Sequence, residues 1–437
     1  MPGYHAVLSP SGADRWMQCP GSVVLSEGLP DTSSDYADEG TAAHFLGAEC
    51  LTSGKHPSEF LGREIVLWES PDGEGTAFAQ NVPLIPVVEV ARFEVTVDMA
   101  GYVNHYVQAV RQQAEGGVLL VEQSLPISTY TGEEGATGSA DAVVFTSDGE
   151  LQIHDLKYGM GKRVIAEENR QLRLYALGAL EEYGLSYDFD SIRLFIHQPR
   201  LASAPSEWAV SLTDLEEFGE RVRNSATMVG IARTVEPASL STYLAPSDEA
   251  CQWCRAKADC PTLYRLVAES ILEGFDDGRE LTPEAIQDAI GNLEHASPAS
   301  LSSKMKATAF AEMWIKAVRG RVETELLAGT PVPDYKIVRG KRGNRKWTDA
   351  TEAESVLKSM RLKVEEMYDL TLISPTTAEK LAKRDPPVIG PRQWKKLQDI
   401  ITLAEGRLSV APDSDPRPAV DMTPKVDDFA DLGDDLI

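Results

Sequence analysis

The chain has 437 residues, enough for two or three domains, and its 42% hydrophobic and 25% charged residues are typical of a globular protein. No apolar run approaches the roughly 18 residues that span a bilayer, and the N-terminus lacks a secretion signal, so we expect a cytoplasmic protein with no membrane partner. The formal net charge of −26 argues against nucleic acid as a partner unless basic residues gather locally.

The first 200 residues predict helices and strands in alternation. Helices are expected at three places before residue 116, namely 9–20, 38–51 and 99–115. A strand over 117–127 is followed by a hairpin, in which Ser147-Asp148-Gly149 provides turn residues between runs at 142–145 and 151–154. A helix over 167–184 and a strand over 191–200 complete an α/β core with at least one crossover.

The remainder divides into a helical region and an acidic tail. Helical patterns extend from about residue 280 to 328, a basic hairpin is expected over 334–348, and short helices follow. We therefore predict an α/β domain over 1–270 and a mainly helical domain over 271–410. The segment 411–437 is rich in proline and aspartate, a composition typical of disorder.

A carboxylate and a lysine lie two residues apart at the end of the predicted hairpin, in the string I-H-D-L-K. Because side chains alternate across a strand, Ile153, Asp155 and Lys157 share one face, and His154 points to the other. Asp155 and Lys157 would emerge together where the strand ends, close to Asp141 on the partner strand. Two neighbouring carboxylates repel each other unless a cation joins them, and Mg²⁺ or Mn²⁺ suits that role.

A metal ion at this place would support phosphoryl chemistry, because it activates water while a nearby lysine orients the water or stabilises developing charge. The alternative is an exposed ion pair between Asp155 and Lys157, which would contribute little. Gln171 and Tyr175 are four residues apart on the next helix and therefore face the same side. His44 could add an imidazole ligand, although a single histidine on a helix is more often structural.

Three of the five cysteines form a C-x2-C-x5-C cluster: Cys251, Cys254 and Cys260. A cytoplasmic chain is not expected to use them as disulfides, and such a cluster more often marks a metal or iron–sulfur site. Unligated buried thiols are the alternative. Cys50 is expected to be a core thiol.

These motifs resemble RecB-like nucleases of the PD-(D/E)XK superfamily over residues 9–262. The order and approximate spacing match in G-x-x-x-H (Gly40 to His44), G-x-x-D (Gly138 to Asp141), D-x-K (Asp155 to Lys157) and Q-x-x-x-Y (Gln171 to Tyr175). Cys19, which is followed by proline, and the later cysteine cluster are similar to the iron–sulfur staple of AddB-type nucleases. Ala140 departs from the proline that often precedes the motif aspartate, at a position that varies in the superfamily.

The resemblance implies a restriction-endonuclease-like core, a mixed central sheet flanked by helices, within 1–270. It implies that His44, Asp141, Asp155 and the Leu156 carbonyl bind Mg²⁺ or Mn²⁺, and that Lys157 is the catalytic lysine. Gln171 and Tyr175 would position the substrate or the catalytic groups. It also implies a [4Fe–4S] cluster on four thiolates, with four-cysteine Zn²⁺ as the alternative; the implied ligands are Cys19, Cys251, Cys254 and Cys260.

The whole chain also resembles a phage and prophage family long described as of unknown function. Proteins of that family are associated with single-strand annealing or ssDNA-binding genes, which implies a partner of that kind in a bacterial host. The predicted hairpin combines phosphate-binding cations with a stacking aromatic, and it would contact DNA or simply be solvated. Its candidate residues are Lys336, Arg339, Lys341, Arg342, Arg345, Lys346 and Trp347.

Together these features predict a metal-dependent DNA exonuclease that hydrolyses phosphodiester bonds at DNA ends, in phage recombination or replication. Two alternatives remain at this point: a structure-specific endonuclease, and a non-catalytic subunit that binds DNA ends in a recombination complex. The acidic tail would bind a partner, compete with DNA for a basic surface, or act as a solvating segment.

Overall fold

The computed structural model describes residues 6–29, 35–70, 73–83, 86–271, 282–293, 296–336, 338, 375–384 and 386–398. The chain divides into two units, Met1–Val338 and Arg339–Ile437. In the second unit the described helices are α14 (Pro375–Ala382) and α15 (Pro391–Gln398), which contact each other. All the site residues discussed below belong to the first unit.

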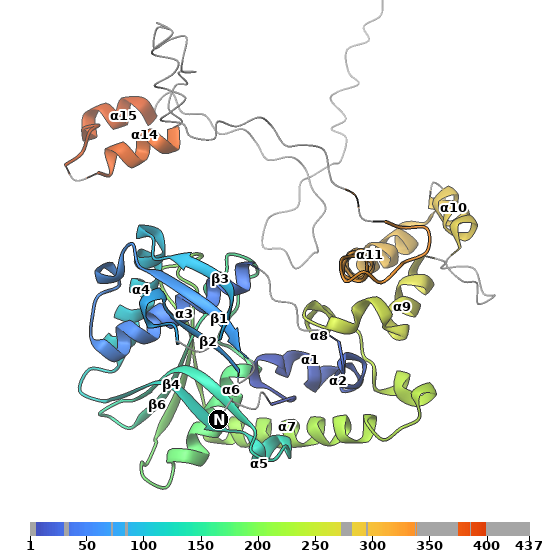
Figure 1. Ribbon diagram of the computed structural model, residues 1–437, viewed down its shortest axis with the longest axis horizontal. Helices are drawn as coiled ribbons and strands as arrows, with labels where there is room; N and C mark the ends of the chain where they lie inside the picture. The colour runs from blue at the N-terminus through green and yellow to red at the C-terminus, as the bar shows by residue number, and fades with distance from the viewer. Residues whose placement is uncertain are drawn as a thin grey trace, which may run out of the picture. The chain divides into compact units, whose positions relative to one another are not determined.

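A five-stranded mixed sheet forms the centre of the first unit (Figure 1). Its strands follow the order β4 (Val118–Pro126), β5 (Thr137–Phe145), β6 (Glu150–Leu156), β7 (Ser191–His197) and β8 (Ser206–Val210). Only the β6–β7 pair is parallel, and helix α6 (Arg170–Tyr183) provides the crossover that this pair requires. The predicted α/β core with a crossover is therefore confirmed.

Helices cover both faces of this sheet (Figure 1). Side chains of β5, β6 and β7 on one face, such as Ile153, pack against α1 (Ala13–Gln18), α6 and α7 (Leu212–Ala232). On the other face, Val144 and Leu156 pack against α3 (Asp35–Ser53) and α4 (Val97–Gln113). The central strands are thus buried on both sides, which leaves their ends as the places where polar side chains can gather.

A second sheet of three antiparallel strands joins the core on the side of α3 and α4. Its strands are β1 (Glu64–Ser70), β2 (Gly73–Phe78) and β3 (Val88–Glu94), in the order β2-β1-β3. Sequence patterns did not indicate this sheet, because its strands contain several charged and glycine residues, nor did they indicate the 21-residue helix α7.

The other described helices of the first unit are of two kinds, short and long. The shorter elements are η1 (Pro10–Gly12), α2 (Gly21–Ser26), η2 (Pro57–Phe60), η3 (Ala79–Asn81), α5 (Ser128–Thr131), η4 (Pro237–Tyr243), α8 (Asp248–Gln252) and η5 (Arg255–Asp259). Three longer helices close the first unit: α9 (Pro261–Ile271), α10 (Pro283–Asn292) and α11 (Pro298–Leu327). The last two confirm the helical region predicted over 280–328.

Local capping sets where the crossover helix begins. Helix α6 starts at Arg170, three residues later than predicted, because the Asn169 side chain accepts a hydrogen bond from the Leu172 amide and ends the preceding loop. This boundary places Arg170 and Gln171 in the first turn of α6, beside the end of β6. Among the described residues, no helix is long and apolar enough to cross a membrane.

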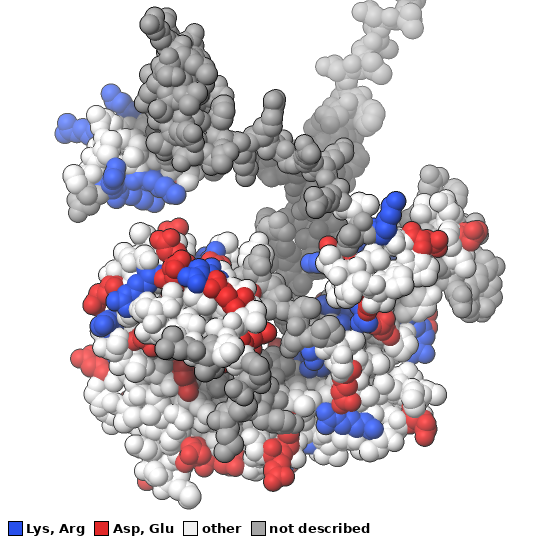
Figure 2. Space-filling model, in the orientation of Figure 1, with Lys and Arg blue, Asp and Glu red and all other residues white. Residues whose placement is uncertain are grey.

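The described surface carries both signs of charge. Figure 2 shows Lys and Arg side chains interspersed with Asp and Glu on the visible face of the first unit, with no single basic patch there. On α15 of the second unit the charged side chains are Arg392, Lys395 and Lys396. Of the basic hairpin predicted over 334–348, residues 334–336 and 338 lie within the described residues, and Lys336 is the candidate DNA-binding residue among them. The other candidates (Arg339, Lys341, Arg342, Arg345, Lys346 and Trp347) and the tail 411–437 lie outside them.

Candidate metal and nuclease site

Three carboxylates lie in line across three neighbouring strands. The β5–β6 ladder ends at the pair Ala142–His154, so the next residues, Asp141 and Asp155, continue the same antiparallel register. On the other side of β5, the pairs Val121–Ala142 and Gln123–Ala140 place Glu122 opposite Asp141. The sheet therefore brings Glu122, Asp141 and Asp155 to one row, although they are far apart in the sequence.

His44 on α3 completes this row from outside the sheet. Its Nδ1 lies 3.1 Å from Asp141 Oδ1, while Asp141 Oδ2 accepts a hydrogen bond of 2.6 Å from the Leu156 amide. Burial opposes a charge on His44, but the adjacent Asp141 carboxylate outweighs burial and raises the pKa of His44 to about 9. The same pairing, together with the Leu156 amide, lowers the pKa of Asp141 in spite of its burial.

Lys157 is held by a chain of hydrogen bonds that starts at Asp155. Its Nζ lies 3.1 Å from Asp155 Oδ1 and 2.9 Å from Oδ2, and it donates to Gln171 Oε1 at 2.8 Å. Gln171 Nε2 donates in turn to the Tyr175 hydroxyl at 3.0 Å. The Lys157 amide donates to the His197 carbonyl at 2.8 Å, which fixes the backbone where β6 ends. The lysine head group is thereby restricted to one position.

Asp155 is the most deeply buried acid of the row, with 3% of its surface exposed. Burial raises its pKa, an effect that Asp141 reinforces and Lys157 opposes. Burial also disfavours the charge on Lys157, but Asp155 outweighs it and raises the pKa of the lysine. Asp155 Oδ2 is buried and forms no hydrogen bond in addition to its ion pair with Lys157. A buried carboxylate oxygen in this state is available to a further ligand such as a cation.

Glu122 is the site residue that sequence reasoning missed. Its backbone has φ of 48°, a left-handed conformation that is rare for a residue other than glycine and that interrupts the β4–β5 ladder opposite Asp141. Ligand atoms of Glu122, His44 and Asp141 all lie within 4.8 Å of one another. Partial removal from water and the nearby Asp141 raise the pKa of Glu122 to about 7. The available signal was a single acid directly after the apolar run Val118–Val121 of β4.

The donor set fits a hard divalent cation. Two ligands at right angles on an ion with bonds of about 2.1 Å lie about 3.0 Å apart, close to the 3.1 Å between His44 Nδ1 and Asp141 Oδ1. Carboxylate oxygens dominate the set, as Mg²⁺ and Mn²⁺ prefer, and one imidazole is compatible with Mn²⁺. Three acids in a row also repel one another, and a cation would relieve this repulsion.

Four of the five cysteines line one small cavity between α2, α8 and η5. Cys19, Cys251, Cys254 and Cys260 are all buried there among apolar side chains such as Leu25 and Leu263. Cys50 lies instead in the core beneath α3 and α4. The cavity thus joins Cys19, at the end of α1, to a segment more than 230 residues later.

Two of the four sulfurs accept hydrogen bonds from backbone amides. Amide groups of Ala245 and Leu263 donate to the Sγ atoms of Cys19 and Cys260, at 3.3 and 3.4 Å. Burial raises the pKa of Cys251 to about 11 and also raises those of Cys19 and Cys260, so these thiols are neutral unless a metal binds them.

The four thiols surround one cavity whose other lining residues are mainly apolar, so they are the donors available to a metal group there. Within the described residues, no cysteine joins a group of three ligand atoms that all lie within 4.8 Å of one another, so the sulfurs are not drawn together as around one zinc ion, where they would lie about 3.8 Å apart. Four cysteine sulfurs are the donor set of both a [4Fe–4S] cluster and a structural zinc ion.

A protein-family model matches most of the chain. The family model with the description "Protein of unknown function (DUF2800)" matches residues 5–418. The match covers the central sheet, the carboxylate row and the cysteine cavity, as well as most of the second unit. Because it spans nearly the whole sequence, the chain belongs to the DUF2800 family.

Proposed function

We propose that this protein is a divalent-metal-dependent DNA exonuclease with a PD-(D/E)XK, restriction-endonuclease-like core. One observation carries the proposal: the lysine that follows the second aspartate is fixed beside a row of three acids whose oxygens can bind a cation. Asp141, Asp155 and Lys157 come from the end of the β5–β6 hairpin, His44 from α3, and Gln171 and Tyr175 from α6. An isolated ion pair at a strand end would not require partners from separate helices.

The residues of the row have distinct roles in phosphodiester hydrolysis. A divalent ion held by His44, Asp141, Asp155 and the Leu156 carbonyl would lower the pKa of water and neutralise charge on the phosphate. Lys157 stays protonated beside Asp155 and donates hydrogen bonds where negative charge develops.

The remaining residues keep the lysine in place. Gln171 accepts from Lys157 and donates to Tyr175, so the amide group fixes the head group of the lysine. The buried Tyr175 closes this chain, and burial raises the pKa of its hydroxyl, which therefore stays neutral. We assign Glu122 as a further acid facing the same cation.

The four-cysteine cavity supports a [4Fe–4S] cluster, with Zn²⁺ as the alternative. Four buried cysteines around one cavity suit either group, and the resemblance of their sequence spacing to the iron–sulfur staple favours the cluster. Its role would be structural, because it joins the first helices to the segment that follows the central sheet.

We place the enzyme in the cytoplasm of a bacterial host, encoded by a phage or prophage, with a single-strand annealing or ssDNA-binding protein as partner.

End-labelled linear DNA and closed circular DNA, incubated anaerobically with Mg²⁺ or Mn²⁺, test this function. We expect the wild-type protein to degrade linear DNA and to leave circular DNA intact. Lys157→Ala should lower the rate by about 100-fold or more, because it removes the cation aimed at the phosphate. Lys55→Ala, at an exposed position outside the site, is the matched control.

The outcomes separate the candidate activities. Cleavage of circular DNA would replace the exonuclease by a structure-specific endonuclease. If metal-loaded wild-type protein leaves linear DNA intact, the nuclease proposal is wrong, and the protein would instead be a non-catalytic subunit that binds DNA ends.

A further inference from the structure

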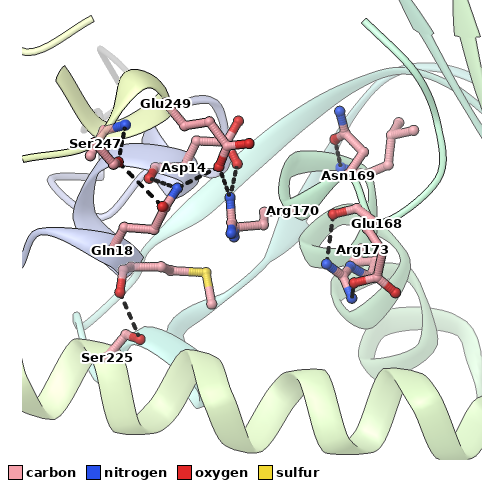
Figure 3. A network of polar contacts seen from close by, with 12 residues as sticks. Asp14, Gln18, Glu168, Asn169, Arg170, Arg173, Ser225, Ser247 and Glu249 are labelled. Atoms are coloured by element: carbon pink, nitrogen blue, oxygen red, sulfur yellow. Dashed lines mark hydrogen bonds and ion pairs between the residues drawn. The ribbon is translucent and has the colours of Figure 1, made fainter. Parts of the chain in front are cut away.

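A polar junction joins α6 to the two segments that carry the cysteines (Figure 3). Arg170, the first residue of α6, donates through Nη1 to Asp14 Oδ1 at 2.6 Å and to Glu249 Oε2 at 3.2 Å. Asp14 belongs to α1 and Glu249 to α8, so one guanidinium bridges three helices. Figure 3 shows both carboxylates directed at Arg170 from the same side.

Gln18 contacts both acidic residues, Asp14 and Glu249. Its Nε2 donates to Glu249 Oε2 at 2.7 Å and to the Asp14 carbonyl at 2.9 Å, and its Oε1 accepts from the Ser247 hydroxyl at 3.3 Å. Ser247 is also the N-cap of α8. We refer to Asp14, Gln18, Arg170, Ser247 and Glu249 as the junction. Each of its side chains contacts another element of the chain, so the five residues act as one unit.

The junction is adjacent to both sites in the sequence. Gln18 directly precedes Cys19, and Glu249 lies two residues before Cys251. The segments that carry the junction on α1 and α8 therefore lead directly to cysteines of the cavity. On the other side, Arg170 directly precedes Gln171, which accepts the hydrogen bond from Lys157. A displacement of Arg170 would therefore reach the lysine through a single peptide unit and one side chain.

Charge balance explains why the arginine keeps this place. Burial opposes the charge of Arg170, but Asp14 and Glu249 outweigh it and raise its pKa. The Arg170 side chain is 27% exposed, whereas those of Asp14 and Glu249 are each 54% exposed. Without the guanidinium, the two carboxylates would repel each other, weakly because each is half-exposed, and α1 and α8 would keep the contacts that Gln18 makes with Ser247 and Glu249. Arg170 is therefore the residue that ties both helices to α6.

We propose that Arg170 is a positioning residue through which metal binding at the four cysteines fixes Gln171 and, with it, Lys157. This inference rests on the proposed function where it assigns catalysis to Lys157. A metal group bound by Cys19 and Cys251 holds α1 and α8 at a constant separation, and their carboxylates then hold Arg170. When the group is lost, the two helices separate, Arg170 loses one carboxylate, and the first turn of α6 loosens.

Hydrogen exchange of the amides in 157–175 tests the coupling without reference to nuclease activity. In the otherwise wild-type protein, Cys254→Ser should increase exchange in the first turn of α6 by about tenfold or more. Arg170→Ala should increase it with the cysteine site still loaded, and adding Cys254→Ser should then change little. Independent contributions of the two changes would overturn the proposal, because uncoupled sites give additive effects. Unchanged exchange in Arg170→Ala would overturn it as well.

Arg233→Ala is the matched control. Arg233 Nε lies 3.0 Å from Glu27 Oε1, with the two side chains 41% and 54% exposed, and the pair joins the ends of α7 and α2. It should leave exchange in α6 unchanged, and its effect should add to that of Cys254→Ser. If Arg170→Ala does not fold, Arg170→Lys gives the same comparison, because lysine keeps the charge but cannot bridge two carboxylates in the same way.

Steady-state kinetics on linear DNA supply the second readout. Arg170→Ala should lower kcat by about 10- to 100-fold with KM unchanged, since a positioning residue does not touch the substrate, and Arg170→Lys should restore part of the rate. A raised KM with unchanged kcat would make Arg170 a DNA contact and overturn the proposal. If the wild-type protein cleaves no DNA, the proposed function fails while the exchange measurement still decides the coupling.

Discussion

Individual residues of the carboxylate row set how pH affects metal binding. A divalent ion needs a neutral imidazole and ionised carboxylates, but His44 keeps its proton up to about pH 9 and Glu122 up to about pH 7. Because the ion must displace these protons, its affinity should rise from about pH 6 to pH 9 and then level off. Titration calorimetry with Mn²⁺ at several pH values measures this dependence, and an affinity that is independent of pH would contradict it.

The Glu122→Gln variant measures how much Glu122 contributes to metal affinity, apart from His44. The amide keeps the shape of the side chain but removes the negative charge, so Mn²⁺ affinity should fall by about tenfold. The part of the pH dependence near pH 7 should disappear, while the part near pH 9, which belongs to His44, should stay. Glu134→Gln, at an exposed position of the loop before β5, is the control and should bind Mn²⁺ as the wild type does.

The sequence identified the residues that short motifs place together, but it did not identify Glu122. Asp155 and Lys157 are two apart on one strand, and the hairpin turn at Gly149 fixes their distance from Asp141, so local rules suffice. Glu122 faces Asp141 through the β4–β5 register, which depends on a ten-residue connection that includes α5 and is too long for its turn residues to fix the register. The alternation rule also placed His154 correctly on the opposite face, where its Nδ1 lies 3.0 Å from His197 Nε2.

At the scale of elements, the packing of α6 and η1 against β5 explains the glycine of the G-x-x-D motif. A Cβ on Gly138 would lie 2.5 Å from Pro10 Cγ and 2.9 Å from Tyr175 Cε1, so no larger residue fits without movement of η1 or α6. Gly138→Ala should lower the free energy of unfolding by about 1–3 kcal/mol. It should also displace Tyr175, which ends the hydrogen-bond chain from Lys157.

Urea denaturation measures this effect against a glycine in open space. Gly101 on α4 is exposed, and a Cβ there would meet nothing within 4 Å. Gly101→Ala should therefore raise the stability by up to about 1 kcal/mol through its helix propensity. If Gly138→Ala leaves the denaturation midpoint unchanged, the close packing of Tyr175 on β5 is wrong.

Elements with strong local signals were predicted more reliably than those that depend on distant partners. The hairpin and the crossover helix α6 follow from turn residues, a helix cap and apolar periodicity, and both are confirmed. The three-stranded sheet was not assigned, since its edge strands β2 and β3 alternate polar and apolar residues only weakly. Its burial comes from contacts with α3, more than ten residues earlier in the chain.

At the scale of the whole molecule, the cysteine cavity closes the longest loop of the first unit. Cys19 and Cys251 bring together segments that share few neighbours in sequence, and the central sheet with its covering helices lies between them. Closing such a loop restricts the unfolded chain, as a disulfide does, and binding of metal adds to this effect. The free energy of unfolding of the first unit should therefore depend on the bound metal as well as on its hydrophobic core.

Cys254→Ser in anaerobically purified protein tests this dependence. We expect the wild type to be brown and to contain about four iron atoms per chain, and the variant to lose both colour and iron and to unfold with a free energy lower by about 3–5 kcal/mol. Cys50→Ser changes a buried thiol outside the cavity, so it should keep the iron and lose only the stability of a packed core residue. Colourless protein with one zinc ion would replace the cluster by a four-cysteine zinc site. Equal stability of Cys254→Ser and wild type would show that neither metal holds the two ends of the first unit together.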